Sequence, residues 1–448
     1  MDKKIMMEEL VREAHEKGVF TGTWLLAEDG DIVAKGAVGF RDAEDRLPMR
    51  EDSIFDIGSV SKQFTAAAVM LLRREGKLGL EDEITKFFPQ IPYAGITIRH
   101  LLTHTSGLPD HLAWVVDTAK KENAIPGNDA VLRYLTECGE EPHFAPGEQW
   151  EYCNAGYSLL AMLVEKLSGM AFPDYLKKNI FDPAGMVSTS LCHRIRNGLA
   201  IEDLACGLVF DNGVLTPAER SFWKDLVVSF DGSEGAGCVK SNIFDLLAWD
   251  RALREEKILT KEEQDLMYTP VRLLNGETGG GGYGFGLGIF DQPGVGKFVW
   301  HEGEWPGYLS WYGHFLDTDR VLVILCSRTG VDGRYISGFF NAMLTIALGY
   351  EPQPLQFTEE MAAADPDKSR WESFCGEYET SSDGLIIEKV YIKDGDLFAL
   401  IYSTEADSRF EARLYPFGED TFGIREDTEE IVFGDGFLTF GGEPCRKL

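Results

Sequence analysis

The sequence predicts an α+β protein: an α/β sandwich in which helices flank an antiparallel sheet, followed by a small all-β barrel. Three observations predict this fold class. Strand-like alternation occurs near the start of the chain and again after residue 283, and helical patterning dominates from residue 61 to about residue 187. Short alternating runs separated by glycine turns fill the last part. A chain of 448 residues is long enough for two or three domains.

The predicted sheet is built from both ends of the first 350 residues. An amphipathic helix at 6–13 precedes a hairpin whose strands span 20–28 and 32–40, joined by an Asp-Gly turn. Later strands are expected at 284–290, 297–301, 308–316 and 320–327. A helix over 335–348 is expected to cover this sheet. The helical block is therefore an insertion between the two halves of one sheet.

Residues 351–370 have the proline-rich and alanine-rich composition of a linker, which leaves a sheet-and-helix domain at 1–350. Beyond residue 371 strand-like runs recur closely, at 384–392, 397–402, 410–415, 431–433 and 437–440. Closely spaced strands with tight turns close most economically into a barrel. We therefore expect residues 371–448 to form a small β-barrel domain.

The charge balance excludes some classes of partner. A net charge of −31 argues against binding to nucleic acid or to an anionic membrane surface, because both require basic patches. The first residues lack the apolar core of a secretory signal, and no apolar run is long enough to cross a bilayer. We expect a cytoplasmic protein that acts on a small molecule or peptide, either as a monomer or as a homo-oligomer.

A serine three residues before a lysine opens a very apolar stretch of the chain. A serine hydroxyl is a poor nucleophile at neutral pH and needs a base beside it. Residues at i and i+3 share one face of a helix, so Lys62 can reach Ser59. Burial and a nearby cation would lower the pKa of Lys62 and let it accept a proton. Taken alone, the pair has a second interpretation, in which Ser59 only caps the helix and Lys62 points to water.

Two further motifs change this balance: Tyr152-Cys153-Asn154 and His301-Glu302-Gly303. In order and spacing, the three motifs resemble those of serine β-lactamases and penicillin-binding proteins, specifically the class C β-lactamase-like branch. Further matching segments span 98–109, 144–157, 235–237, 283–286 and 301–308. The resemblance covers about residues 20 to 345 and implies a β-lactamase/transpeptidase-like catalytic domain.

The resemblance also implies a role for each motif residue. Ser59 would be the nucleophile, and Lys62 and Tyr152 would share general-base and general-acid duty, with the order of proton transfer open. Asn154 would hydrogen-bond Lys62 and a substrate carbonyl. The backbone N–H groups of Ser59 and Glu304 would form the oxyanion hole.

The third motif departs from the Lys-Thr-Gly or Lys-Ser-Gly of many relatives. His301 and Gly303 give the His-x-Gly form that is commoner in the family's esterases and D-aminopeptidases, which this chain resembles more closely. With Lys62, His301 would supply a cation near a tyrosinate. Glu302 either discourages a substrate carboxylate and welcomes an amine, or faces away from the cleft, since neighbours alternate along a strand. Trp305 is a candidate for substrate contact or for packing.

We therefore expect a serine hydrolase that cleaves a small amide or peptide, including one with a D-residue, through a Ser59 acyl-enzyme. A carboxylesterase, a β-lactamase or DD-carboxypeptidase, and a slowly acylating penicillin-binding scaffold are the alternatives. No metal or organic cofactor is expected, since His100 and His104 have no evident third ligand. The opening of the last domain, residues 374–378, resembles the lipocalin-like barrels appended to some hydrolases of this family.

Overall fold

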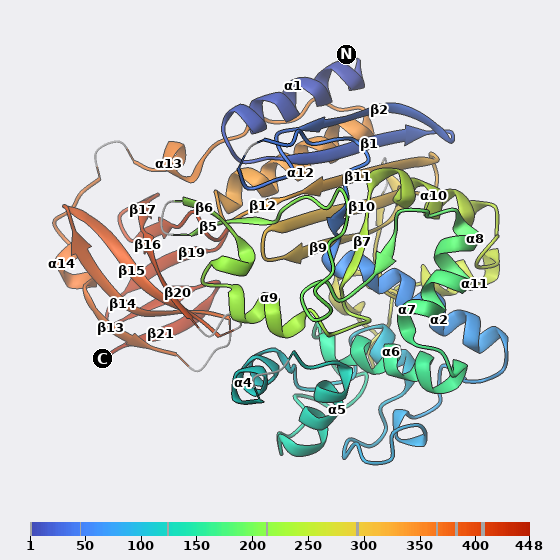
Figure 1. Ribbon diagram of the computed structural model, residues 1–448. Coiled ribbons are helices and arrows are strands. Elements are labelled where there is room, and N and C mark those ends of the chain that lie inside the picture. Colours follow the sequence, from blue (N-terminus) through green and yellow to red (C-terminus); the bar gives the residue numbers. More distant parts are fainter. Residues whose placement is uncertain are drawn as a thin grey trace.

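A computed structural model describes residues 2–44, 46–122, 125–211, 214–292, 295–363, 366–380, 384–404 and 408–448. Its centre is a six-stranded antiparallel sheet in the order β2-β1-β11-β10-β9-β8 (Figure 1). The strands are β1 (Gly22–Glu28), β2 (Asp31–Val38), β8 (Gly288–Gln292), β9 (Gly296–Trp305), β10 (Tyr308–Phe315) and β11 (Arg320–Cys326). β1 pairs with β11 along its whole length. The predicted sheet made from both ends of the domain is therefore present.

Two strands differ from the prediction. β9 runs four residues further, to Trp305, because it pairs with β10 as far as Tyr308. The third motif consequently lies within a strand. β8 begins only at Gly288, because the Gly284 N–H donates to the Leu287 carbonyl at 2.8 Å and closes a turn before the strand.

Helices cover both faces of the sheet, as an α/β sandwich requires. The covering helices are α1 (Lys3–Glu16) and α12 (Gly333–Leu348) on one face and α10 (Ile243–Arg254) on the other. On the first face, Trp24, Ile324 and Phe339 are buried in one apolar cluster. The prediction of an α+β fold is confirmed.

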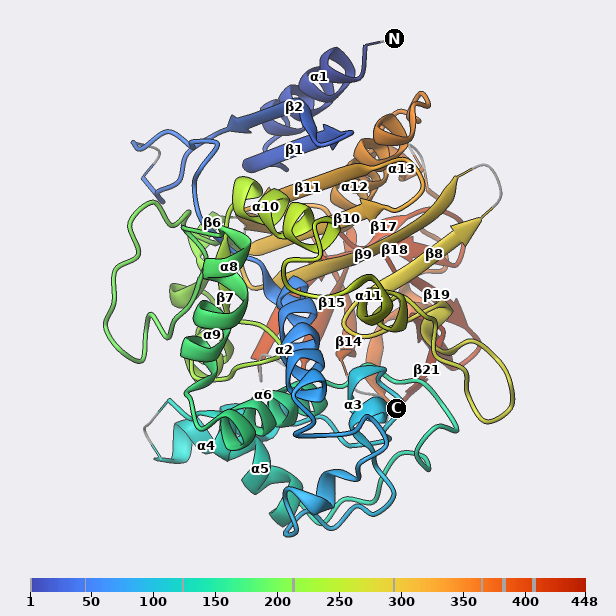
Figure 2. The ribbon, with the colours of Figure 1, turned by 90° about the vertical axis from the view of Figure 1, so that its right-hand side faces the viewer.

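The insertion is helical, and its central helix, α2, runs from the sheet into the helical block (Figure 2). It comprises η1 (Gly58–Ser61), α2 (Lys62–Arg74), η2 (Ile84–Lys86), α3 (Ile98–Leu102), α4 (Leu112–Glu122), α5 (Asn128–Glu137), α6 (Asn154–Ser168), α7 (Phe172–Leu176), η3 (Lys177–Phe181), α8 (Asp182–Ala184), η4 (Ala218–Arg220), α9 (Lys224–Phe230), α11 (Lys261–Met267) and η5 (Gly279–Gly281). α2 is buried almost all round, and Phe64 packs edge-on against Phe181 and Trp249. No helix in the described ranges is both long and apolar enough to cross a membrane.

Two small sheets brace this insertion. They are formed by β3 (Phe55–Asp56), β7 (Val239–Ser241) and β4 (Ser190–Leu191), and by β12 (Arg328–Thr329), β5 (Leu208–Asp211) and β6 (Val214–Pro217). The first sheet holds the chain that enters η1 beside the segment at 235–238. The second lies next to the end of the central sheet, since β12 follows β11 directly.

The last part of the chain is a nearly closed antiparallel barrel. Its nine strands are β13 (Gly376–Glu379), β14 (Leu385–Lys393), β15 (Asp396–Ser403), β16 (Ser408–Arg413), β17 (Tyr415–Pro416), β18 (Thr421–Gly423), β19 (Glu430–Gly434), β20 (Phe437–Phe440) and β21 (Glu443–Lys447). α14 (Trp371–Phe374) contributes Trp371 and Phe374 to the barrel core. The predicted all-β barrel is confirmed.

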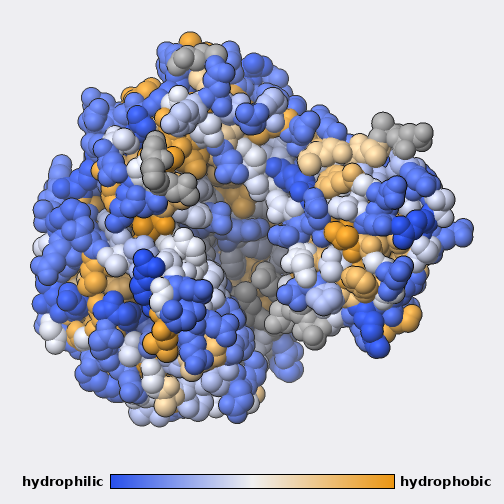
Figure 3. Space-filling model, turned by 180° about the vertical axis from the view of Figure 1, so that it is seen from behind, coloured by the Kyte–Doolittle hydropathy of each residue, from blue (hydrophilic) through white to orange (hydrophobic). Residues whose placement is uncertain are grey.

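The barrel is fastened to the catalytic domain through the segment between them. α13 (Thr358–Met361) lies in that segment, and the ring of Phe357 stacks on Tyr335 at 4.6 Å between centroids. The buried carboxylate of Asp332 accepts hydrogen bonds from the N–H groups of Tyr335 and Thr358, both at 2.9 Å. A hollow separates the larger body from the barrel lobe on the side seen in Figure 3.

Asp332 is therefore expected to hold both the start of α12 and the connecting segment. Replacing it with alanine removes a helix cap and leaves the buried Thr358 N–H without its acceptor, which should destabilise the protein by about 2–4 kcal/mol. Thermal and urea unfolding of Asp332→Ala test this, with Glu377→Ala on an exposed barrel position as the matched control. Equal unfolding midpoints for Asp332→Ala and wild type would contradict it.

Candidate active site

Ser59 lies in η1, the tight turn ahead of α2, and Lys62 is the first residue of α2 itself. The prediction placed both on one helix. The turn forms because the Asp56 carboxylate accepts the Gly58 N–H at 2.9 Å, and Lys240 pairs with the same carboxylate at 3.2 Å. Ser59 is half-buried at the cavity surface, whereas Lys62 is fully buried beneath it.

The Lys62 amine has three partners. Its Nζ atom lies 3.0 Å from Ser59 Oγ, 2.9 Å from Asn154 Oδ1 and 2.8 Å from the Ala236 carbonyl oxygen. Burial lowers the pKa of Lys62 to about 7, with the nearby Asp110 carboxylate opposing the shift. Near neutral pH, a large share of the amine is uncharged and able to accept a proton.

The geometry of these partners favours one orientation of the uncharged amine. The Asn154 and Ala236 oxygens only accept hydrogen bonds, so they take the two N–H bonds of a neutral amine. Its lone pair then faces Ser59, whose hydroxyl can donate. Asp110 fixes the orientation of the Asn154 amide. Its carboxylate, 3.4 Å away, can only accept a hydrogen bond, so the NH₂ group of Asn154 faces Asp110 and the amide oxygen faces Lys62. The sequence analysis did not identify Asp110 as a residue of the site.

Tyr152 stands over the lysine, with Lys62 Nζ 4.7 Å from the centre of its ring. The chain on both sides of Tyr152 is held by His104, whose carbonyl accepts the Glu151 N–H and whose Nδ1 accepts the Cys153 N–H. Burial raises the pKa of Tyr152 above its usual value, although the Ser59 hydroxyl acts in the opposite direction. Tyr152 is therefore a phenol at neutral pH, poised as a proton donor.

His301 lies beneath the site and is buried. Its Nε2 atom is 2.9 Å from the hydroxyl of Tyr283, and burial together with Lys62 lowers the pKa of His301 to about 3. A pKa of about 3 makes the imidazole neutral near pH 7, which does not support the expectation that His301 supplies a cation. His301 is hydrogen-bonded to Tyr283 and is not among the described residues that line the cavity.

Gly303 allows η1 to approach β9 backbone to backbone. A Cβ atom at this position would lie 2.0 Å from the Ile57 carbonyl oxygen and 2.4 Å from Ser310 Oγ. A Cβ on Gly58, whose φ is +49°, would come within 2.9 Å of the Glu304 nitrogen. The absence of both side chains brings the backbone just before Ser59 next to that of Gly303 and Glu304, which is compatible with the expected oxyanion hole of the Ser59 and Glu304 N–H groups.

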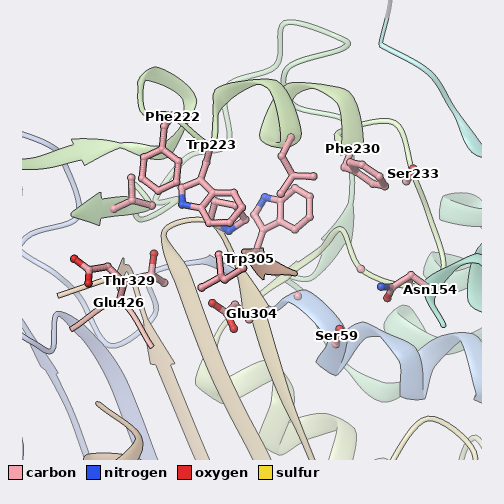
Figure 4. A pocket seen from close by; sticks show the side chains of 18 of the residues that line it. Ser59, Asn154, Phe222, Trp223, Phe230, Ser233, Glu304, Trp305, Thr329 and Glu426 are labelled. Carbon is pink, nitrogen blue, oxygen red and sulfur yellow. The ribbon is translucent and has the colours of Figure 1, made fainter. Parts of the chain in front are cut away.

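A cavity of about 440 Å³ opens above Ser59. Its lining is Gly58, Ser59, His111, Tyr152, Asn154, Ser158, Val209, Phe210, Asp211, Phe222, Trp223, Leu226, Phe230, Ser233, Ala236, Gly237, Cys238, Glu304, Trp305, Pro306, Thr329, Gly330, Leu385, Phe410, Glu411 and Glu426. Figure 4 shows Ser59 and Asn154 at one end, with Phe222, Trp223 and Trp305 toward the other. The last four lining residues come from the barrel.

Glu302 in the third motif and Trp305 just after it, the two candidate substrate contacts, differ in whether they line the cavity. Trp305 lines the cavity, as a residue that contacts the substrate would. Glu302 is exposed and lies opposite Trp311 of β10, on the face of the sheet that α1 and α12 cover, while His301 lies opposite Tyr312 on the other face. Glu302 is not among the described residues that line the cavity, although its carboxylate is near enough to raise the pKa of Tyr152.

A serine next to a buried lysine and a tyrosine, with two backbone segments in close approach beside it, is the arrangement expected of an acyl-transferring serine enzyme. The family model described as Beta-lactamase matches residues 7–343. The chain belongs to this family and is a β-lactamase-related serine hydrolase. Among the described residues, no group of three or more His, Cys, Asp or Glu side chains is placed to hold a metal ion.

Similarity to known proteins extends over both domains. Penicillin-binding protein 4* of Bacillus subtilis (strain 168) is 34% identical over 438 residues, which cover 96% of this chain and 94% of that protein. A D-aminopeptidase of Cereibacter sphaeroides (strain KD131 / KCTC 12085) is 26% identical over 81% of this chain and 64% of its own length. The octameric penicillin-binding protein homologue from Pyrococcus abyssi covers 100% of both chains at 26% identity, with a TM-score of 0.66.

Gly303→Ala should lower kcat by about 100-fold or more, because the new methyl group pushes η1 away from β9 and separates the two oxyanion donors. The kcat of Gly303→Ala on p-nitrophenyl acetate tests this. Gly79→Ala is the control, since a Cβ there meets nothing closer than 3.7 Å. A Gly303→Ala enzyme with the kcat of wild type would show that the close approach is not needed.

Proposed function

We propose that this enzyme hydrolyses short amides or peptides that carry a free amine, with a preference for a D-residue, through an acyl-enzyme at Ser59. The observation that carries the proposal is the charge of the cavity wall. Four carboxylates line it, on Asp211, Glu304, Glu411 and Glu426, and the described lining contains neither lysine nor arginine, so that Lys393, which pairs with Glu411, offsets only one of them from outside the lining. Its histidine, His111, lies 2.9 Å from the Asp110 carboxylate. Such a wall attracts an amine and repels a carboxylate.

The aromatic part of the lining fits the same class of substrate. Phe222, Trp223, Phe230 and Trp305 offer ring faces on which an apolar side chain packs and over which a cation is stabilised. The similarity to a D-aminopeptidase supports amide hydrolysis. The octameric homologue supports a homo-oligomer as the working form of this chain.

In the proposed acylation, Ser59 Oγ attacks the carbonyl carbon while its proton passes to the lone pair of neutral Lys62. The carbonyl oxygen becomes an oxyanion that accepts hydrogen bonds from the N–H groups of Ser59 and Glu304. The Tyr152 hydroxyl then gives its proton to the leaving nitrogen as the C–N bond breaks, and Lys62 returns a proton to the phenolate. Net, one amide bond breaks, one ester bond forms and one amine leaves.

Deacylation reverses these roles with water in place of the amine. Lys62 and Tyr152 together take a proton from the water as its oxygen attacks the ester carbonyl. The tetrahedral intermediate uses the same backbone donors, and its collapse returns a proton to Ser59. A carboxylic acid leaves, and the enzyme recovers its starting protonation state.

The proposal predicts how activity depends on pH. Because only uncharged Lys62 accepts a proton, kcat/KM for p-nitrophenyl acetate should rise as the pH increases through about 7 and then level off. The ester carries no ionisable group, so the profile reports the enzyme. Asp110→Asn should move the rise to lower pH, because the Asp110 carboxylate raises the pKa of Lys62. Activity that falls as the pH rises through 7 would exclude Lys62 as the base.

The charge of the substrate gives a second test. D-alanyl p-nitroanilide should be cleaved with a kcat/KM at least about 10-fold above that of N-succinyl-D-alanyl p-nitroanilide, because the succinyl group replaces the ammonium with a carboxylate. L-alanyl p-nitroanilide reports the preference for the D-residue, and Ser59→Ala should cleave none of them. A preference for the succinylated compound, or for nitrocefin, would overturn the proposed substrate class.

A further inference from the structure

The barrel forms the end wall of the active-site cavity. Leu385, Phe410, Glu411 and Glu426 of the barrel line the same space as Ser59. Phe410 stacks on Phe222 of the catalytic domain, at 5.7 Å between ring centres. In Figure 4, Glu426 and Ser59 lie at opposite ends of the site, with aromatic side chains between them. A ligand that fills the cavity from the nucleophile onward therefore ends at the barrel.

The backbone around Glu426 is firmly held on both sides. Glu426 follows Ile424, which is fully buried in the barrel core, and Arg425, whose carbonyl accepts the Gly333 N–H from the start of α12 at 2.7 Å. The Arg425 guanidinium pairs with Glu359 at 2.5 Å. The side chain of Glu426 thus extends toward the cavity from a backbone fixed to both domains.

The carboxylate of Glu426 lacks a donor for one of its oxygens. Its Oε2 atom is buried and accepts no hydrogen bond from any of the described residues. Burial raises the pKa of Glu426 to about 7, and Asp332 adds to the shift while Arg425 opposes it. An acceptor buried in this way is costly, and a ligand that brings an N–H donor removes the cost.

The surroundings of Glu426 favour a cation as that donor. Glu411, the other barrel carboxylate in the lining, already pairs with Lys393 at 2.5 Å. The remaining charged groups of the described lining, Asp211 and Glu304, are also acidic. An ammonium group would donate to Glu426 Oε2 and hold that carboxylate ionised, and the two nearby cations are already paired, Arg425 with Glu359 and Lys393 with Glu411.

We propose that Glu426 of the barrel binds an ammonium group at the end of the substrate remote from the scissile carbonyl, so that substrate recognition spans both domains. The inference rests on the proposed function, because it assumes hydrolysis at Ser59. The substrate class is narrowed to short peptides or acyl amides with an extended chain. Their free N-terminus or lysine-type amine lies beyond the aromatic lining.

The test compares pairs of acyl p-nitroanilides that differ only at the far end of the chain: 6-aminohexanoyl with hexanoyl, 8-aminooctanoyl with octanoyl and 10-aminodecanoyl with decanoyl. Wild type should favour the amino-terminated member by about 10- to 100-fold in kcat/KM at one chain length. Glu426→Gln should reduce that ratio to about threefold or less. Glu430→Gln, on an exposed barrel position, should keep the wild-type ratio.

A second measurement does not depend on turnover. Calorimetric titration of Ser59→Ala with octylamine and with octan-1-ol should show tighter binding of the amine, and this difference should vanish in Ser59→Ala/Glu426→Gln. Equal binding of amine and alcohol to Ser59→Ala, or the same anilide ratio in wild type and Glu426→Gln, would overturn the role of Glu426. If wild type cleaved none of the anilides while the amine still bound through Glu426, the proposed function alone would fail.

Discussion

The burial of one amine, Lys62 Nζ, determines how the catalytic region has to be built. An amine taken out of water must find acceptors or give up its charge, and this one does both in part. Its partners come from η1, from the start of α6 and from the glycine-rich segment around Ala236. Three parts of the chain that are far apart in sequence therefore have to meet at one atom. The packing of the buried helix α2 is what brings them together.

The charge of the site differs between the groups beneath the cavity and those that line it. Beneath the cavity floor the basic groups carry little positive charge, since burial lowers the pKa of both Lys62 and His301, and the Asp110 carboxylate is negative. Around the cavity the charged side chains are acidic. A cationic substrate consequently meets attraction at the wall without strong repulsion from the catalytic base. This arrangement links the neutral imidazole of the third motif to the kind of substrate that the wall selects.

Local patterns predicted much of this structure. The hairpin, the helix after β11 and the three motifs around Ser59 depend on short-range signals, and the structure brings the Ser59, Tyr152 and His301 motifs close together. Asp110 could not be recognised, because its role appears only when its loop folds against α6. The neutrality of His301 follows from burial, which no motif records. Glu426 lies more than a hundred residues beyond the third motif, in a domain whose contact with the cavity is purely tertiary.

The pairing of β1 with β11 has a consequence for how the enzyme is made. Glu28 lies opposite Arg320, so β1 is synthesised long before its partner β11. At about 5–20 residues per second, a ribosome needs roughly 15–60 s to supply that partner. During this interval the inner edge of the N-terminal hairpin is open and apolar, the kind of edge that recruits other strands. Until β11 is made, a nascent chain therefore depends on shielding of the β1 edge, for example by a chaperone, to avoid aggregation. A chain that ends before residue 320 would keep this edge unpaired.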